Sequence, residues 1–358
     1  MFRLKTLKRR EPLKRGSLLI LPIALALALA LSLSMLWVQG KPPLKGLAII
    51  VQGAFGAGYA IEDTLLKAVP IYLCALGVAV TFRMRIWNIG AEGQFALGAI
   101  GATWAALTFP DLPGFVLIPL MMASSAAAGL VWAAGPALLK LKLQVNEIIT
   151  TLMLNYIAIL FLDWLVYGPW KDPISFGFPM TEMFSDAAQV GTIPGLRLHW
   201  GLLLCVAAGV AVALFLGRTR LGYELKASGE APAAARYARM PYGFLVVFVM
   251  AACGALAGWA GFLETSAVVG RLQPSIMVGY GYTAIVVAWL ARLKPGGIAL
   301  AAILLAALRV GVENLQLELQ VPAAFGRIME GLILLSVLSG QYFQYYRPKI
   351  VRSAGGGS

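Results

Sequence analysis

Long apolar runs alternate with short polar segments along the whole chain. We place the runs near residues 17–38, 65–82, 93–109, 114–136, 147–167, 199–217, 243–267, 279–291, 296–312 and 328–344. A helix rises about 1.5 Å per residue, so runs of this length can cross a hydrocarbon core of about 30 Å. The pattern predicts an all-α, polytopic transmembrane protein with about ten spans. The apolar stretch 47–61 is short and rich in glycine, and we expect it to form a helix at the membrane interface.

The order of the runs also predicts how the chain is organised. Five runs precede a proline-rich segment at 168–198 and five follow it. Because five is an odd number, two halves of five spans cross the membrane in opposite orientations, as in the inverted repeats of many transporters. We therefore expect one membrane domain over residues 1–350, with a tail at 1–16, an ordered outer loop at 168–198 and a cytoplasmic loop at 218–242. Residues 351–358 are expected to form a tail that includes an added Gly-Ser linker.

Basic residues are concentrated on one side of this predicted topology. Most of the 29 Lys and Arg residues lie at the N-terminus, at 83–85, 140–142, 218–242 and 292–294, and near the C-terminus. If the chain crosses ten times, all of these segments are cytoplasmic. The bias predicts a multi-pass protein of the cell membrane with both termini in the cytoplasm.

Composition excludes several classes of protein. The chain is 60% hydrophobic and 13% charged, whereas soluble domains carry about 25% charged residues. The net charge of +13 comes from short basic clusters between apolar runs, which argues against nucleic acid as a partner. One histidine and three dispersed cysteines cannot build a metal centre or a nucleophilic catalytic site, so we expect no metal and no enzymatic activity.

Polar side chains gather at residues 83–94. Asn88, Glu92 and Gln94 stand between Gly90 and Gly93, and glycine permits unwound backbone, which at membrane depth must line protein or water. Such a segment can offer amides and carbonyls to a polar solute. The alternative is an ordinary cytoplasmic turn between two helices.

A second polar group lies within the run that begins at Glu147. Asn155 and Tyr156 follow about two turns later, and they can bond neighbouring helices or contact a solute. The rings of Trp87, Tyr156 and Tyr282 could stack on a flat solute ring; the alternative for them is the aromatic belt at the membrane surface.

The 218–242 loop differs from the other loops because it is rich in alanine. Ser228 or Gly229 can start a helix, Glu230 would lie in its first turn, and Pro232 is tolerated there. The sequence predicts one short helix over 229–240 that ends before Pro241. Its small residues could fit the groove of a partner; the alternative is a solvated loop helix.

Five motifs give the chain a family resemblance. They read GYELKASGEAPAAARYA at 222–238, NIGAEGQ at 88–94, EIITTLMLNY at 147–156, GYGYTAI at 279–285 and VPAAF at 321–325. In this order they resemble the permease subunits of ABC importers, in the branched-chain-type group that serves simple sugars and nucleosides. The NIGAEG form is more similar to the nucleoside-type members than to the ribose-type members.

The resemblance implies a larger machine. A second permease subunit would complete the path, a solute-binding protein would deliver the solute from outside, and cytoplasmic ATPase subunits would bind ATP and Mg²⁺. This chain has no GxxxxGK[ST] phosphate loop and no expected cofactor of its own. A secondary transporter driven by an ion gradient is the alternative function.

The substrate path is predicted at Trp87, Asn88, Glu92, Gln94, Asn155, Tyr156 and Tyr282. ATPase coupling is predicted at Gly222, Ser228, Gly229, Glu230, Pro232, Ala233, Ala234, Arg236 and Tyr237.

Overall fold

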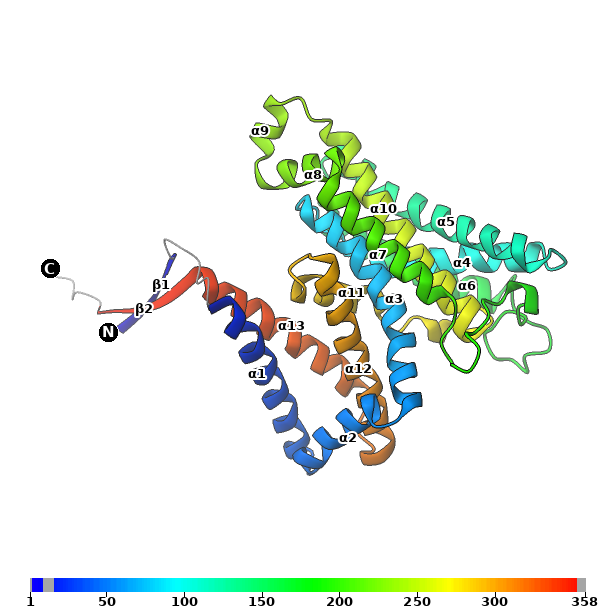
Figure 1. Cartoon of the computed structure of the whole chain (residues 1–358), viewed down its shortest axis with the longest axis horizontal. Coiled ribbons are helices and arrows are strands. Elements are labelled where there is room, and N and C mark those ends of the chain that lie inside the picture. Colours follow the sequence, from blue (N-terminus) through cyan, green and yellow to red (C-terminus); the bar gives the residue numbers. More distant parts are fainter. Residues whose placement is uncertain (1, 9–15, 353–358) are drawn as a thin grey trace. The chain divides into compact units, whose positions relative to one another are not determined.

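The computed structural model describes residues 2–8 and 16–352, with side chains described for 22–340 and Tyr342. Helices make up most of this part (Figure 1). The long helices are α1 (Gly16–Val38), α2 (Pro43–Phe55), α3 (Gly58–Arg83), α4 (Ala91–Thr108), α5 (Gly114–Leu143), α6 (Glu147–Tyr167), α7 (Gly201–Arg218), α8 (Arg220–Glu230), α10 (Tyr242–Leu263), α11 (Tyr280–Leu290), α12 (Pro295–Leu319) and α13 (Ala324–Tyr345). The shorter helices are α9 (Pro232–Tyr237), the 3-10 turns η1 (Asp186–Ala188) and η3 (Pro274–Ile276), and the π-helix η2 (Glu264–Val269), which continues α10.

Each of the ten predicted apolar runs overlaps one of these helices. Six helices in the described residues are long and apolar enough to cross a membrane: α3, α5, α6, α7, α12 and the continuous helix α10–η2. Part of α1, α2 and the segment η3–α11 are shorter apolar helices. The structure thus confirms a polytopic helical protein, and the count of ten spans stays a prediction.

A short two-stranded sheet is the exception to the predicted all-α class. Strand β1 (Phe2–Lys8) pairs antiparallel with β2 (Tyr346–Arg352), with Phe2 opposite Arg352. The predicted N-terminal tail therefore includes a strand. The remainder of the two predicted tails, at residues 1, 9–15 and 353–358, lies outside the described residues.

The predicted interfacial helix at 47–61 is wrong in its bounds. Helix α2 ends at Phe55, and α3 already begins at Gly58. Glycines 56 and 58 flank a bend at this point, and glycine's conformational freedom favours such interruptions. The stretch therefore contributes to two helices.

The chain divides into two compact units by its internal packing. One unit comprises residues 1–53 and 308–358, and the other comprises residues 54–307. In the first, Leu36, Ile50 and Phe325 belong to a buried cluster, and Arg309 pairs with Glu330 at 3.5 Å. This division does not test the predicted inverted repeat.

The larger unit is built on helices whose backbones touch. A Cβ added to Gly98 of α4 would lie 2.2 Å from the Cα of Gly258 in α10, and one added to Gly129 of α5 would lie 2.1 Å from the carbonyl oxygen of Gly254. A Cβ on Gly77 of α3 would lie 2.9 Å from the Cα of Cys253. Small residues allow this close packing, which is typical of helices in membranes.

The 168–198 loop is fastened to the segment that follows α10. The backbone N–H of Thr181 donates to the carbonyl of Leu272 at 3.0 Å, and that of Phe184 donates to Gly270 at 2.8 Å. The Ser266 hydroxyl donates to the carbonyl of Ala188 at 2.6 Å. The loop is therefore ordered, as its prolines predict.

Candidate translocation site and coupling segment

The connection between α3 and α4 is the non-helical segment 84–90; of the two glycines on which the prediction of unwound backbone rested, Gly90 ends this segment and Gly93 lies inside α4. Asn88 is fully buried, and its amide exchanges two 3.3 Å hydrogen bonds with the amide of Gln94. The Asn88 Oδ1 also accepts from the N–H of Gly90 at 2.9 Å, and its Nδ2 donates to the Sγ of Cys253 at 3.2 Å. The side chain therefore fixes the turn that starts α4.

Helix α6 holds the same turn from a second side. Asn155, also fully buried, donates through Nδ2 to the carbonyl of Ile89 at 2.8 Å, and its Oδ1 accepts from the N–H of Gly93 at 2.9 Å. The hydroxyl of Thr151 accepts from the N–H of Ile89 at 3.2 Å. The Asn155 amide thus bonds the Ile89 carbonyl, which precedes α4, and the Gly93 N–H, which lies in the first turn of α4. The N–H groups of a first turn have no partner within their own helix.

Glu92 joins α4 to the start of α11. Its carboxylate is 2% exposed and accepts from the backbone N–H of Gly279 at 3.0 Å and of Gly281 at 2.7 Å. A negative charge at a helix N-terminus satisfies unpaired N–H groups and complements the helix dipole. We call Asn88, Glu92, Gln94 and Asn155 the polar cluster.

Two glycines make this junction possible. Gly279 has φ 91°, a left-handed conformation that other residues rarely adopt. A Cβ on Gly281 would lie 2.2 Å from the backbone nitrogen of Glu92. The 88–94 motif and the start of α11 are therefore in direct contact.

The polar cluster lies beside the middle of α10 rather than at its end. Cys253, which accepts from Asn88, is roughly 16 Å along the helix axis from Tyr242, at 1.5 Å per residue. Because α10 with η2 is long enough to span a membrane, this position favours a re-entrant connection over an ordinary turn at the membrane surface.

The seven predicted substrate-path residues fall into two groups. The four members of the polar cluster are buried, and their polar atoms bond to the protein itself. The three aromatic residues are partly exposed: Trp87 at 42%, Tyr156 at 56% and Tyr282 at 36%. We call these three the aromatic face.

The two groups are directly linked. The Asn155 amide donates to the Tyr282 hydroxyl at 3.2 Å. Trp87 stacks on Trp289 of α11 with ring centroids 5.5 Å apart. The Asn155 amide thus holds the Tyr282 ring, and Trp289 packs against Trp87.

The 218–242 loop holds two helices, so the single helix predicted over 229–240 is wrong. Helix α8 begins at Arg220 because the Thr219 hydroxyl caps it, accepting from the N–H of Gly222 at 3.0 Å. Ser228, Gly229 and Glu230 end this helix instead of starting one. Pro232 lacks an N–H and starts a separate helix, α9, after a break at Ala231.

The inner side of α8 is packed on the end of α3. A Cβ on Gly229 would lie 2.3 Å from the carbonyl oxygen of Arg83 and 3.0 Å from Met84 backbone atoms. Leu225 is fully buried in a cluster that includes Met84 and Ile86. Helix α8 is therefore seated directly on the start of the 84–90 connection.

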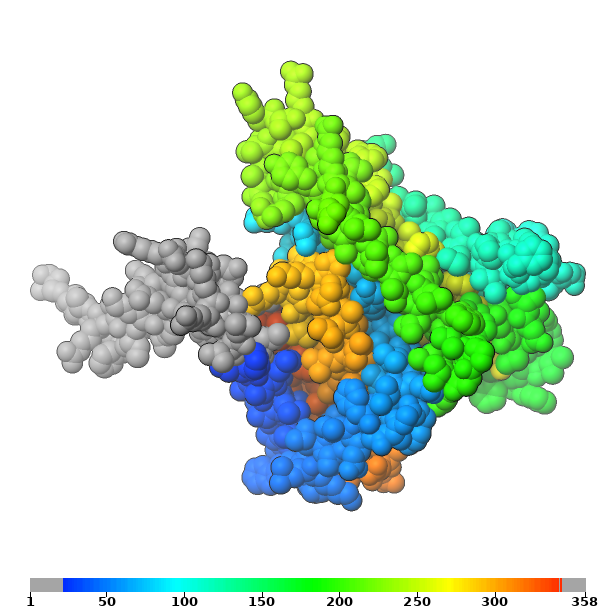
Figure 2. All heavy atoms as spheres, in the orientation of Figure 1, coloured from blue at the N-terminus to red at the C-terminus, as the bar shows by residue number. Residues whose placement is uncertain are grey.

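The outer side of this region is open. Glu230, Pro232, Ala233, Ala234, Arg236 and Tyr237 are exposed, Tyr237 at 93%. Figure 2 shows α8 and α9, in light green, as a projection of the larger unit. We call the two helices the coupling segment. Of the nine predicted coupling residues, Gly222, Ser228 and Gly229 are buried and the other six are exposed.

Sequence reasoning missed several residues of this arrangement. Thr219 carries a recognisable signal, since threonine before a helical stretch is a common N-cap. The Arg83 guanidinium donates to the carbonyl of Leu293, just beyond α11, at 3.3 Å. No sequence pattern indicates that contact, because 210 residues separate its two partners.

Comparison with known proteins identifies the family. A family profile described as "Branched-chain amino acid transport system / permease component" matches residues 60–338. A glucose ABC transporter permease protein from Haloferax volcanii is 35% identical over 85% of this chain and 83% of its own length.

Two further relatives are named for nucleosides. A guanosine ABC transporter permease protein from Bacillus subtilis is 31% identical over 94% of this chain and 98% of its own length. A nucleoside ABC transporter permease protein from Lactococcus lactis subsp. cremoris is 30% identical over 77% of this chain and 78% of its own length. The resemblance read from the five motifs is confirmed: the chain belongs to the branched-chain-type permease family of ABC transporters, as a multi-pass membrane subunit.

Proposed function

We propose that this chain forms half of the path through which an ATP-driven importer carries a nucleoside, or a simple sugar, across the cell membrane. The relatives named above carry guanosine, nucleosides or glucose by name. All of these solutes have a flat or ring-shaped face and many hydroxyls. They suit a site of rings and amides better than a charged one.

The observation that carries the proposal is the aromatic face beside the polar cluster. Trp87, Tyr156 and Tyr282 come from three different elements, and the Asn155 amide holds the Tyr282 hydroxyl at 3.2 Å. Such rings stack weakly on a passing base or sugar. A path needs weak contacts because a solute must also leave.

The coupling segment supplies the connection to ATP. Partner ATPases would bind the exposed residues of α8 and α9 and move them. Because Gly229 is seated on Arg83 and Met84, that movement would reach the 84–90 connection and, through Glu92, the start of α11. Tilting α4 and α11 would change access to the aromatic face.

The proposed assembly keeps ten spans and cytoplasmic termini. It includes a second permease subunit, which is the same chain or a related one, and a binding protein at the outer face. Hydrolysis of ATP would belong to the ATPase chains, so this subunit would not itself be an enzyme.

The test is uptake by the reconstituted transporter. The Tyr282→Ala variant should lower guanosine uptake and leave co-purification of the ATPase unchanged. Tyr167→Ala is the matched control, because Tyr167 is an exposed tyrosine at the far end of α6. Equal uptake by wild type and Tyr282→Ala would refute the role of the aromatic face. Uptake that survives ATP depletion and stops when the proton gradient collapses would instead support the ion-gradient alternative.

A further inference from the structure

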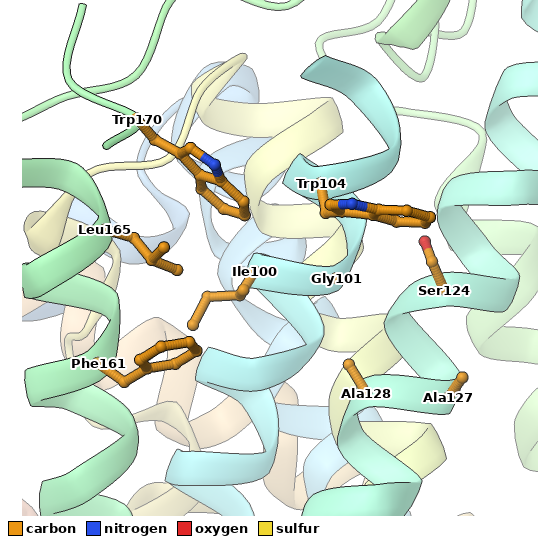
Figure 3. Close-up of a pocket in the computed structure, with 9 residues that line it drawn as sticks. All are labelled: Ile100, Gly101, Trp104, Ser124, Ala127, Ala128, Phe161, Leu165 and Trp170. Carbon is orange, nitrogen blue, oxygen red and sulfur yellow. The ribbon is translucent and has the colours of Figure 1, made fainter. Parts of the chain in front are cut away.

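An apolar groove lies in the larger unit, away from the polar cluster and the coupling segment. It has a volume of about 430 Å³ and lies between α4, α5 and α6. Figure 3 shows Trp104, Phe161 and Trp170 around Ile100, with Ser124, Ala127 and Ala128 of α5 on the opposite wall. The groove is near the ends of α4 and α6 that lead into the loops at 109–113 and 168–200.

The chemistry of the walls excludes a nucleoside or sugar. Eight of the nine lining residues have no polar side-chain group other than an indole N–H. The ninth, Ser124, already donates its hydroxyl to the carbonyl of Met121 at 3.1 Å. A solute with many hydroxyls would lose its hydrogen bonds to water here without replacing them.

Small residues create the space. A Cβ on Gly101 would lie 2.7 Å from the carbonyl oxygen of Ser124, so α4 and α5 touch at the floor. Ala127 and Ala128 leave room above this contact, and Ala127 is exposed. The groove is thus lined almost entirely by carbon.

The surroundings of the groove point to its occupant. Only 22% of the apolar stretch of α5 and 28% of that of α6 is buried, compared with 78% for α3. Their exposed surfaces carry large apolar side chains such as Val131, Leu160 and Trp164. The lining residues Trp104, Ala127 and Phe161 are themselves exposed, so the groove opens to its surroundings, and in a bilayer the exposed apolar sides of spanning helices face acyl chains.

We propose that the groove binds one acyl chain of a bilayer phospholipid, with the rings of Trp104, Phe161 and Trp170 packed along it. The proposal depends on the chain being a membrane protein and not on the identity of its solute.

The first test counts lipid on the purified full-length chain. After exchange into detergent, native mass spectrometry should show a retained phospholipid on wild type. Ala127→Phe, which fills the groove, should lose it. Ala123→Phe is the matched control, because Ala123 is an exposed alanine one turn earlier on α5 that does not line the groove. Equal retention in the two variants would overturn the proposal.

A second test does not require a substitution that fills the groove. Brominated phosphatidylglycerol, added to the protein in detergent micelles, quenches tryptophan fluorescence on contact. Trp104→Phe and Trp170→Phe should each remove part of the quenching. Trp37→Phe should not, since Trp37 is an exposed tryptophan of α1 that does not line the groove. Unchanged quenching in the first two variants would overturn the proposal. So would a disulfide between two copies of an Ala127→Cys chain in membranes, which would show that another subunit covers the groove.

Discussion

The polar cluster bonds its polar side chains inside the chain, whereas the coupling segment leaves many of its polar and small residues exposed. In the polar cluster, four uncharged or acidic side chains are buried: Asn88, Glu92 and Asn155 bond backbone groups of the 84–90 connection, of α4 and of the start of α11, and Gln94 bonds Asn88. In the coupling segment, one side of α8 is buried through glycine, and most of the rest of the segment is exposed, apart from Ala235. The first arrangement specifies a single geometry within the chain. The second presents a surface that only another protein would complete.

Replacing Glu92 by leucine should have the largest effect on the polar cluster. The change leaves the N–H groups of Gly279 and Gly281 buried without an acceptor, at about 1–3 kcal/mol each. We expect a large fall in the melting temperature, measured by fluorescence-detected size exclusion after heating. Glu62→Leu, near the start of α3, is the control and should melt close to wild type. A Glu92→Leu protein as stable as that control would show that the carboxylate does not hold α11.

Replacing Gly229 by alanine should have the next largest effect, at the junction of the two regions. The added Cβ would meet the Arg83 carbonyl oxygen at 2.3 Å, so α8 must shift, at about 1–3 kcal/mol. ATPase should still bind, because the exposed residues are intact, while uptake per ATP hydrolysed should fall. The control is Gly217→Ala, where nothing lies within 4 Å of the added Cβ. Unchanged coupling in Gly229→Ala would argue against transmission through Arg83 and Met84.

Removing the cap of α8 should have a smaller effect. Thr219→Ala loses the hydrogen bond to Gly222, typically about 1 kcal/mol for a helix N-cap. Thr219→Ser keeps the hydroxyl and should restore stability. Thermal melting distinguishes the two variants, and equal losses would mean that the methyl group, not the cap, matters.

Truncating Tyr237 should have the smallest effect on the isolated chain. The side chain is 93% exposed, so Tyr237→Ala should change the free energy of unfolding by no more than about 0.5 kcal/mol. Co-purification of the ATPase should nevertheless fall. Tyr59→Ala, an exposed tyrosine at the start of α3, should leave it unchanged. If the ATPase co-purifies with Tyr237→Ala as fully as with wild type, Tyr237 is not part of the proposed contact.

The fold was predictable where one physical rule dominated. Every apolar run became a helix because a segment surrounded by lipid must satisfy its own backbone. The non-helical backbone at 84–90 overlaps the predicted stretch 83–94, although Gly93 lies inside α4. The coupling helices were misplaced because two local signals competed: Ser228 was read as a cap, while Thr219, nine positions earlier, is the residue that caps α8.

The structure brings the four polar residues singled out in the sequence together, and their role in transport stays a prediction. Asn88, Glu92, Gln94 and Asn155 were expected to contact solute because polar groups in spans are costly. Their cost is instead offset by partners such as Gly279, almost 190 residues away in sequence from Glu92. Pairings at that distance depend on tertiary contacts, which a single sequence does not display.

The touching backbones of Gly98 with Gly258 and of Gly129 with Gly254 restrict how this protein can change shape. Helices in such contact have no side chains between them to rearrange, so sliding one past another would break the fit along its whole length. Helices α4, α5 and α10 must consequently travel as a rigid body. Any opening and closing of the pathway has to occur by rotation of that block, with α6 and α11 bonded to it, against helices that lack such contacts with it, such as α7.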